Sequence, residues 1–479
     1  MKEITELEPR GLWRQFATIC SIPHPSKHEE KLRQYVVDFA GRHGLECRQD
    51  EVGNVVVCKP ATPGYEGHPT VILQAHMDMV PQKNSDLKFD FETDPIRPYV
   101  DGEWVTAEGT TLGADDGMGV AAMLAILEAD RVPHPALECL FTVDEETGLT
   151  GANLLGEGML TGEILINLDS EDEGELYVGC AGAVNVTADF DYREVATPDD
   201  CAGYEVALSG LKGGHSGLEI VLQRGNANKL LARFLRENPY VLVAKIDAGG
   251  LRNAIPREAK AVVAVPAERT EEFERATVEF ERTIRHELAH VEDEIRFGAK
   301  RTELPARVAE EDFRNRFVAA LTAMPNGIMR MSDTVPGLVE TSTNLSRIEM
   351  GEGKAQLLFM VRCMVNYGKP QVVAMIDSVV SLAGGRIEAQ GDYDGWAPNP
   401  DSKILRVMKE GYEKRFGRTP EVKAIHAGLE CGIIGAKYPK LDMISIGPTM
   451  RFPHSPDEKV HIASVERFYE FLLDTLKSL

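Results

Sequence analysis

Strand-like and helix-like stretches alternate along the chain up to about residue 180. Four short apolar runs are strand candidates: Asn54–Lys59, Thr70–Ala75, Ala136–Val143 and Glu163–Leu168. Between them, Gly117–Asp130 is small and apolar on most faces, which suits a helix buried against a sheet. Because such alternation is typical of sheets with helical crossovers, the sequence predicts an α/β fold with a central mixed sheet.

The middle of the chain, residues 183–395, has a different pattern, with long charged helices such as Thr270–Phe297. Its first half holds the helix-like NANKLLARFL, and its second half again reads strand, strand, helix, over Leu338–Glu349, Ala355–Val365 and Pro370–Leu382. This pattern predicts a separate α+β domain that carries an internal duplication.

Features of the first sheet return near the end, where Asp442–Ile446 is a short apolar strand candidate and Ile462–Leu479 an amphipathic helix candidate. We therefore expect one discontinuous domain from residues 1–182 and 396–479, interrupted by an inserted domain of residues 183–395. A chain of 479 residues is long enough for two such cores.

The formal net charge of -24 disfavours nucleic acid and anionic membranes as partners, because long-range repulsion would slow such encounters. A small molecule or short peptide is the more natural substrate. The start of the chain lacks a signal-peptide pattern and no stretch reaches roughly 18 apolar residues, so we expect a cytoplasmic protein. The eight cysteines are scattered singly, which is typical of reduced, buried thiols.

Acidic and histidine side chains follow the predicted strands, or a turn-rich segment before the small-residue helix. Open α/β sheets bind ligands at the carboxyl ends of their strands, so these side chains are expected to converge. Several carboxylates in a small volume repel one another unless they are protonated or bind cations. One such motif alone is most often a solvated turn, but several in compatible order predict a two-cation site. The residues are His76, Asp78, Asp115, Glu145, Glu146 and Asp169.

The expected ligands are nitrogen and oxygen atoms without a thiolate, which suits Zn²⁺, with Co²⁺ or Mn²⁺ as substitutes. The motifs QAHMDMV, LGADDGMG, DEETGLTGA, NLDSEDEGE, GGHSG and FPHSPDE occur in this order. Through them the chain resembles the co-catalytic zinc peptidases that include the aminoacyl-histidine dipeptidases, from about Leu12 to Leu473.

The resemblance implies that Asp115 bridges two metal ions. It implies His76 and Asp169 as further ligands of one ion, and Glu146 and His454 as further ligands of the other. His461 is the competing residue for His454, but PHSP matches the family motif and VHI reads as ordered backbone.

The resemblance also implies that Asp78 orients His76, a role that chemistry favours because a ligating imidazole usually donates its other N–H to an acceptor. It implies Glu145 as the general base that takes a proton from a metal-activated water and delivers it to the leaving amine. Asp144 is the competing choice of base. The resemblance also implies that the bond between Asp115 and Asp116 is cis, a geometry that non-proline residues adopt mainly at functional sites.

Substrate-binding residues are expected in the inserted domain and in a late loop. His215 in GGHSG resembles the family histidine that stabilises a tetrahedral oxyanion, although the segment also reads as a tight turn. Arg362, in an apolar strand, suits a substrate carboxylate, with an internal salt bridge as the alternative. HAGLEC, with His426, Gly428 and Glu430, resembles the family loop near the substrate's amino end.

A literal H-E-x-x-H occurs at His286, Glu287 and His290, the zincin pattern of two histidines one helical turn apart. It lies in a stretch that is charged on most of its circumference, as expected of a solvated surface helix. We therefore interpret it as coincidental.

The resemblance predicts a metal-dependent dipeptidase with Xaa-His or broad specificity and an inserted domain that acts as a lid. Related enzymes whose lid is a single unit pair two chains, and the partner donates the oxyanion histidine. The inserted domain here is about twice that size, so its duplication could take the place of the partner. A homodimer is also compatible with the sequence. The alternatives are an N-acyl amino acid amidohydrolase of the same fold and a non-catalytic peptide-binding protein, which is disfavoured because every expected site position is filled.

Overall fold

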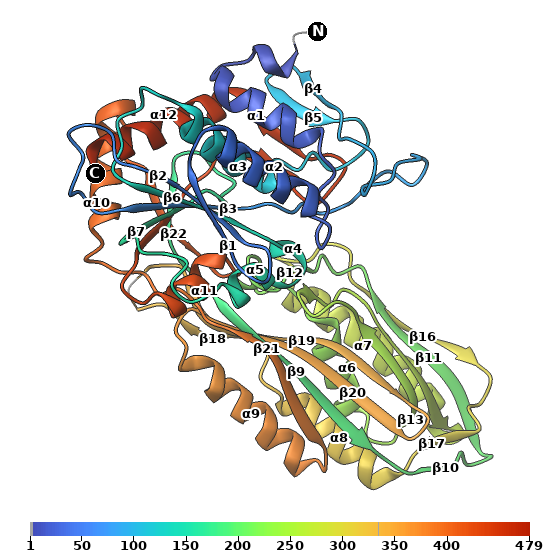
Figure 1. Ribbon diagram of the computed structural model, residues 1–479. Helices are drawn as coiled ribbons and strands as arrows, with labels where there is room; N and C mark the ends of the chain where they lie inside the picture. Colours follow the sequence, from blue (N-terminus) through green and yellow to red (C-terminus); the bar gives the residue numbers. More distant parts are fainter. Residues whose placement is uncertain (1–2, 334) are drawn as a thin grey trace. The chain divides into compact units, whose positions relative to one another are not determined.

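The computed structural model describes residues 3–333 and 335–479 (Figure 1). Residue contacts divide the chain into two compact units. The first unit comprises Met1–Cys180, Trp396–Ala424 and Leu429–Leu479, and the second comprises Ala181–Gly395 and Ile425–Gly428. The division differs from the expected domain limits by a residue or two, and in the short segment Ile425–Gly428, which groups with the second unit.

The first unit is built on an eight-stranded mixed sheet with the order β1-β2-β6-β3-β7-β23-β8-β22. The strands β3 (Val71–His76), β6 (Leu137–Thr142), β7 (Ile164–Asn167) and β23 (Asp442–Ser445) run parallel to their neighbours among these four. Every residue of β3 and β6 is buried, which explains why both read as continuous apolar runs. The other strands are β1 (Glu46–Gln49), β2 (Val55–Lys59), β8 (Glu175–Cys180) and β22 (Glu421–Ile425).

The helix α3 (Ala114–Glu128) is almost wholly buried and packs against β3 and α1 (Arg10–Cys20). Its apolar, small-residue sequence leaves no charged face, so it must be covered on all sides. The remaining helices of this unit are η1 (Ile4–Glu6), α2 (Glu30–Arg42), α4 (Glu145–Gly148), α5 (Thr150–Leu154), α10 (Lys403–Phe416), α11 (Glu430–Lys437) and α12 (Ile462–Ser478). A small sheet has the order β24 (Met450–Arg451), β25 (Lys459–His461), β5 (Trp104–Ala107) and β4 (Pro98–Asp101).

The second unit repeats one topology twice. The segments β11, α6, β13, β15, α7 and β16 form a β-α-β-β-α-β set with the sheet order β16-β11-β15-β13, and β9, α8, β19, β20, α9 and β21 form another with the order β21-β9-β20-β19. Both orders read 4-1-3-2 within their own set, and the two sets join edge to edge through antiparallel β13 and β19. The shared strand order supports the predicted duplication, and the first set is inserted between β9 and α8 of the second.

The strands of these sets are β9 (Gly182–Asp191), β11 (Cys201–Ser209), β13 (Leu242–Gly249), β15 (Ala259–Pro266), β16 (Arg296–Thr302), β19 (Val339–Gly351), β20 (Lys354–Cys363) and β21 (Arg386–Tyr393). The helices are α6 (Ala227–Glu237), α7 (Thr270–Glu287), α8 (Glu311–Ala323) and α9 (Gly368–Leu382). The shorter elements are β10 (Glu194–Ala196), β12 (Gly214–His215), β14 (Ala254–Ile255), β17 (Arg307–Ala309), β18 (Gly327–Met331), η2 (Ile220–Leu222) and η3 (Ala267–Arg269). One continuous apolar core lies among these elements.

The long helix expected over Thr270–Phe297 was wrong at its C-terminal end, because α7 ends at Glu287 and residues from Arg296 onward form β16. Phe297 pairs with Leu208 of β11 and is buried there. Pairing with the neighbouring strand therefore overrides the helix-like charge pattern. Among the described residues, no helix combines the length and apolar character needed to cross a membrane.

Candidate metal centre

Three of the expected metal ligands follow adjacent parallel strands of the first unit. His76 is the last residue of β3, Glu146 lies in the short helix α4 that follows β6, and Asp169 comes two residues after β7. Asp115 lies in the first turn of α3, and His454 lies in the loop between β24 and β25. All five side chains therefore reach the same end of the sheet from loops and element ends, as sheets of this kind require.

Asp115 lies between two histidines. Its Oδ1 is 3.2 Å from Nε2 of His76, and its Oδ2 is 3.3 Å from Nε2 of His454. On the first side, Oδ1 of Asp169 is 3.6 Å from the His76 ring nitrogen, and on the second, Oε1 of Glu146 is 3.0 Å from that of His454. The two groups, His76–Asp115–Asp169 and Asp115–Glu146–His454, each hold their ligand atoms within 4.8 Å of one another and share one carboxylate.

The charges of the cluster fit a cation site. Burial alone would lower the pKa of His454, but its contacts with Asp115 and Glu146 raise that pKa to about 11. Burial would raise the pKa of Asp115, yet its hydrogen bonds with His454 and His76 hold it below the usual range. These carboxylates strongly stabilise a positive charge beside them. Together with the imidazole nitrogens they form a donor set that suits divalent ions such as zinc.

Asp78 links His76 to the glutamate pair through both its backbone and its side chain. Its carbonyl oxygen lies 3.0 Å from Nδ1 of His76, and its Oδ1 lies 3.4 Å from the same nitrogen. Its carboxylate accepts the backbone N–H of Glu145 at 2.9 Å and that of Glu146 at 3.2 Å. Asp78 thus contacts the imidazole, as expected, and also holds the loop that carries the expected base.

Glu145 and Asp144, the two candidates for the base, have different surroundings. The carboxylate of Asp144 accepts hydrogen bonds from the hydroxyls of Thr147 and Thr150, so both of its oxygens are engaged. Glu145 is half-buried, and burial together with repulsion from Asp169 raises its pKa well above the usual range. A raised pKa is typical of a carboxylate that accepts and returns a proton.

The peptide bond between Asp115 and Asp116 is cis, which confirms the prediction. His461, the competing ligand, accepts the backbone N–H of Ser464 on its Nδ1 at 3.2 Å and caps α12. This cap engages one ring nitrogen of His461.

Glu458 is a buried carboxylate that the sequence analysis missed. It accepts the backbone N–H groups of Leu112 at 2.8 Å, Gly113 at 3.1 Å, Ala114 at 2.7 Å and Asp115 at 3.4 Å. Glu458 thereby fixes the segment that presents Asp115, from a position four residues after His454. Glu458 lies in the motif FPHSPDE, from which only His454 was predicted as a site residue.

In the second unit, the expected oxyanion residue His215 lies beside Arg362. The Nδ1 of His215 accepts the backbone N–H groups of Gly217 at 3.3 Å and Leu218 at 3.1 Å, so in the neutral ring Nε2 carries the proton. Burial and the nearby Arg362 lower the pKa of His215 to about 4, which keeps the ring neutral. Nη2 of Arg362 lies 3.4 Å from that Nε2, so two donor groups face each other.

Arg362 is buried in β20, and its Nε has no hydrogen-bond partner. Among the residues that the structure describes, its electrostatic and hydrogen-bond partner is the side chain of Tyr393 and not a carboxylate, so the alternative of an internal salt bridge finds no support there. A buried guanidinium without a carboxylate is well suited to an anionic ligand.

The residues of HAGLEC fall in both units. Gly428 belongs to the second unit, where an added Cβ would lie 2.8 Å from the hydroxyl of Tyr393. His426, in the same unit, is buried with its Nε2 2.8 Å from Oγ of Ser342. Glu430 belongs to the first unit and is completely buried, so its expected contact with substrate stays a prediction.

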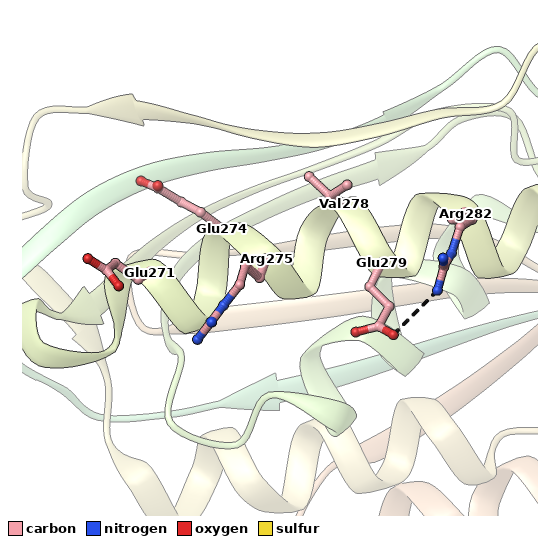
Figure 2. Close-up of a pocket in the computed structure, with 6 residues that line it drawn as sticks. All are labelled: Glu271, Glu274, Arg275, Val278, Glu279 and Arg282. Carbon is pink, nitrogen blue, oxygen red and sulfur yellow. Dashed lines mark ion pairs between the residues drawn. The ribbon is translucent and has the colours of Figure 1, made fainter.

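The H-E-x-x-H segment does not form a metal site in the described part of the chain. His286 and Glu287 are the last residues of α7, and His290 lies beyond the helix end. Glu287 is paired with Arg233 at 2.6 Å, and all three motif residues are exposed. Figure 2 shows charged side chains along α7, among them the ion pair of Glu279 with Arg282. The interpretation as a solvated surface helix is confirmed.

Comparisons with known proteins agree with this fold and site. The sequence pattern of "Peptidase family M20/M25/M40" matches residues 72–478. The cytosol non-specific dipeptidase of Escherichia coli is 45% identical over 484 aligned positions, which cover 100% of this chain and 99% of that protein.

Among solved structures, the aminoacylhistidine dipeptidase from Vibrio alginolyticus is 48% identical, with a TM-score of 0.92 over 100% of this chain and 98% of that one. A tripeptidase from Staphylococcus aureus has a TM-score of 0.62 at 16% identity, covering 98% of both chains, and shares the fold. These matches confirm the predicted α/β peptidase fold and the resemblance to the aminoacyl-histidine dipeptidases. The chain is a hydrolytic peptidase and belongs to the peptidase family M20/M25/M40.

Proposed function

We propose that this protein is a metal-dependent dipeptidase of broad specificity that cleaves dipeptides with a free amino terminus, including those that end in histidine. The observation that carries the proposal is Asp115, whose two oxygens lie 3.2 and 3.3 Å from the ring nitrogens of His76 and His454. The Escherichia coli and Vibrio alginolyticus relatives, named as dipeptidases, support it over the full length of the chain.

For the metal ions, we propose His76, Asp115 and Asp169 as ligands of one divalent cation and Asp115, Glu146 and His454 as ligands of a second. Zinc is the preferred ion because the donors are imidazole nitrogens and carboxylate oxygens, and cobalt or manganese would fit the same set. When bound, such ions polarise the scissile carbonyl and lower the pKa of water.

Glu145 is the proposed general base. Its raised pKa suits a group that takes a proton from the attacking water and passes it to the leaving amine. Asp78 holds the backbone N–H of Glu145 and contacts Nδ1 of His76, so it keeps the base and a ligand in fixed positions.

For the substrate, we propose that His215 and Arg362 bind its oxygen atoms. The protonated Nε2 of His215 and Nη2 of Arg362 face each other at 3.4 Å, and because both are donors, each suits an oxygen acceptor of the substrate. His215 stabilises the oxyanion that develops on the carbonyl, and Arg362 binds the terminal carboxylate. Gly428 is proposed to lie near the substrate's amino end, and its lack of a side chain permits the close approach of the Tyr393 hydroxyl.

The first unit is the proposed catalytic domain, and the second is the proposed lid. We also propose a cytoplasmic location, which the name of the Escherichia coli relative supports, and no nucleic-acid or membrane partner, which the net charge supports. A homodimer is compatible with these roles.

The test is a substrate panel with purified, zinc-loaded protein. β-Alanyl-histidine and leucyl-glycine are compared with N-acetyl-histidine and N-acetyl-leucine, and hydrolysis is followed by release of free amino acid. The proposal predicts cleavage of the dipeptides and little cleavage of the acetylated compounds. The reverse order would favour the N-acyl amino acid amidohydrolase, and binding without cleavage would favour a peptide-binding protein.

A further inference from the structure

Glu430 is a fully buried carboxylate at the start of α11 to which the proposed function above gives no role. We propose that it is a positioning residue for His76 and Asp169, the two ligands that share a proposed metal site with Asp115 on the side away from Glu146 and His454. It acts through a buried chain of hydrogen bonds across the strands β6, β3 and β7. This inference rests on the metal sites of the proposed function.

The chain of hydrogen bonds begins at Oε2 of Glu430. This oxygen accepts the hydroxyl of Thr142 at 2.6 Å and the side-chain N–H of Gln74 at 2.5 Å. Oε1 of Gln74 accepts the side-chain N–H of Asn167 at 2.6 Å. Oδ1 of Asn167 in turn accepts the backbone N–H of Asp169 at 3.3 Å.

The polar side chains of this network all lie in the core of the first unit. Glu430, Gln74, Thr142 and Asn167 have no exposed surface. The hydroxyl of Ser445 on β23 also donates to Oδ1 of Asn167. Because a buried polar group that loses its partner is costly, these contacts hold the side chains firmly.

The carboxylate sets the direction of the whole chain. Because Oε2 of Glu430 accepts the N–H₂ group of Gln74, the side-chain oxygen of Gln74 points the other way, toward Asn167. Asn167 then turns its N–H₂ group to Gln74 and its oxygen to Asp169. Each amide orientation follows from the one before it, beginning at Glu430.

Two ligands benefit from this order. Gln74 and His76 are two residues apart on β3, so their side chains leave the same face of the strand. Asp169 receives its backbone hydrogen bond at the far end of the chain. Among the described residues, the hydrogen bonds of the network do not involve Glu146 or His454. The expected effect of losing Glu430 is therefore confined to the ion held by His76 and Asp169.

The complete burial of Glu430 distinguishes this role from the substrate contact expected from the sequence. One of its oxygens is engaged by Gln74 and Thr142, and the other is buried without a hydrogen-bond partner. A carboxylate kept in the core at such a cost is more consistent with support of the neighbouring cation site than with capture of a solvated amino group.

The test is a metal titration of the metal-free protein with Zn²⁺ in competition with a chromophoric chelator, which resolves the two binding steps. Glu430→Gln keeps the size of the side chain but turns an N–H₂ group toward the network. Asp169→Asn and Glu146→Gln serve as references that identify the step belonging to each site. Glu173→Gln is the matched control, because Glu173 is a buried glutamate of the same unit that pairs with Arg467 and Arg418.

We expect Glu430→Gln to weaken the step that Asp169→Asn weakens by about 10- to 100-fold, the range found for residues that orient metal ligands, and to leave the other step unchanged. Thr142→Val, which removes one donor to Glu430, should change the same step by a smaller factor, and it provides the test if Glu430→Gln does not fold. Glu173→Gln should change neither step.

Two results would overturn the proposal. Wild-type affinity at both steps in Glu430→Gln and Thr142→Val would show that the network does not position the ligands. A raised KM for dipeptides with unchanged metal affinities would assign Glu430 to the substrate instead. Failure of the proposed function would be seen separately. Wild-type protein that binds two ions but does not cleave dipeptides would contradict the proposed function, while the metal titration would still test the role of Glu430.

Discussion

The carboxylate of Asp78 accepts the backbone N–H of Glu145 at 2.9 Å. Since the carbonyl oxygen of the same aspartate lies 3.0 Å from Nδ1 of His76, one residue fixes a proposed ligand and the proposed base together. The positions of the proposed base and of this proposed ligand therefore depend on the same neighbouring residue.

Replacement of Asp78 tests this link. Asp78→Asn turns an amide N–H₂ toward one of the two backbone N–H groups of the Glu145–Glu146 segment, so we expect kcat to fall by about 10- to 100-fold with weaker metal binding. The measurement is steady-state hydrolysis at saturating zinc, with exposed Asp38→Asn as control. Equal kcat for Asp78→Asn and wild type would contradict the linking role.

Glu145→Gln separates the base from the ligands. A glutamine cannot accept the proton of water, so kcat should fall by about 10²- to 10⁴-fold while KM and zinc content stay near those of the wild type. Glu146→Gln should instead reduce zinc content. Zinc content and hydrolysis rate measured on the same samples check both expectations, and a Glu145→Gln variant with full activity would remove Glu145 as the base.

Glu458 anchors the segment that presents the bridging carboxylate. Glu458→Ala leaves four backbone N–H groups without their acceptor, each at a cost of about 1–3 kcal/mol if it stays buried. We expect the metal-free protein to be destabilised in urea and both zinc-binding steps to weaken, because both ions share Asp115. Glu458→Gln should be intermediate, and unchanged affinity at both steps in Glu458→Ala would contradict the account.

Acid should destabilise the metal-free protein in part through the buried His426 and the half-buried His215. Burial, then the charge of Arg362, lower the pKa of His426 to about 3 and that of His215 to about 4, against 6.5 for a free side chain. Between pH 6.5 and about 4 the unfolded chain therefore binds more protons at these positions, and the free energy of unfolding falls as the pH falls.

Replacing His426 should remove its share of this dependence. Urea unfolding of His426→Gln between pH 7 and 4 should show a shallower decline than the wild type, and His28→Gln, at an exposed position, is measured alongside as the matched substitution. A decline in His426→Gln as steep as in the wild type would show that His426 does not stay neutral in the fold.

Much of the site was predictable because its chemistry follows the local sequence. His76, Glu145, Glu146 and Asp169 come soon after buried apolar strands, and parallel strands bring such positions to one edge. The fold class was predictable for the same reason, since β3 and β6 are buried along their whole length and therefore read as apolar runs.

The supporting residues could not be predicted in this way, because their roles arise from contacts between distant parts of the chain. Glu458 binds the N–H of Ala114 across a sequence separation of 344 residues, and Glu430 binds Gln74 across 356. The strand at Arg296–Thr302, which begins where a helix was expected, has a similar origin, because it pairs with β11. A local motif can single out such a residue, as FPHSPDE and HAGLEC contain Glu458 and Glu430, but neither it nor periodicity gives the distant partner.

The central claim is that hydrolysis depends on two ions that share Asp115, and a metal reconstitution measures it most directly. Metal-free protein is loaded with increasing equivalents of Zn²⁺, and the rate of β-alanyl-histidine or leucyl-glycine cleavage is followed with bound metal determined by mass spectrometry. The account predicts no turnover without metal and a maximal rate at two bound ions per chain. Full activity in the metal-free protein, or no activity at any zinc loading, would contradict it.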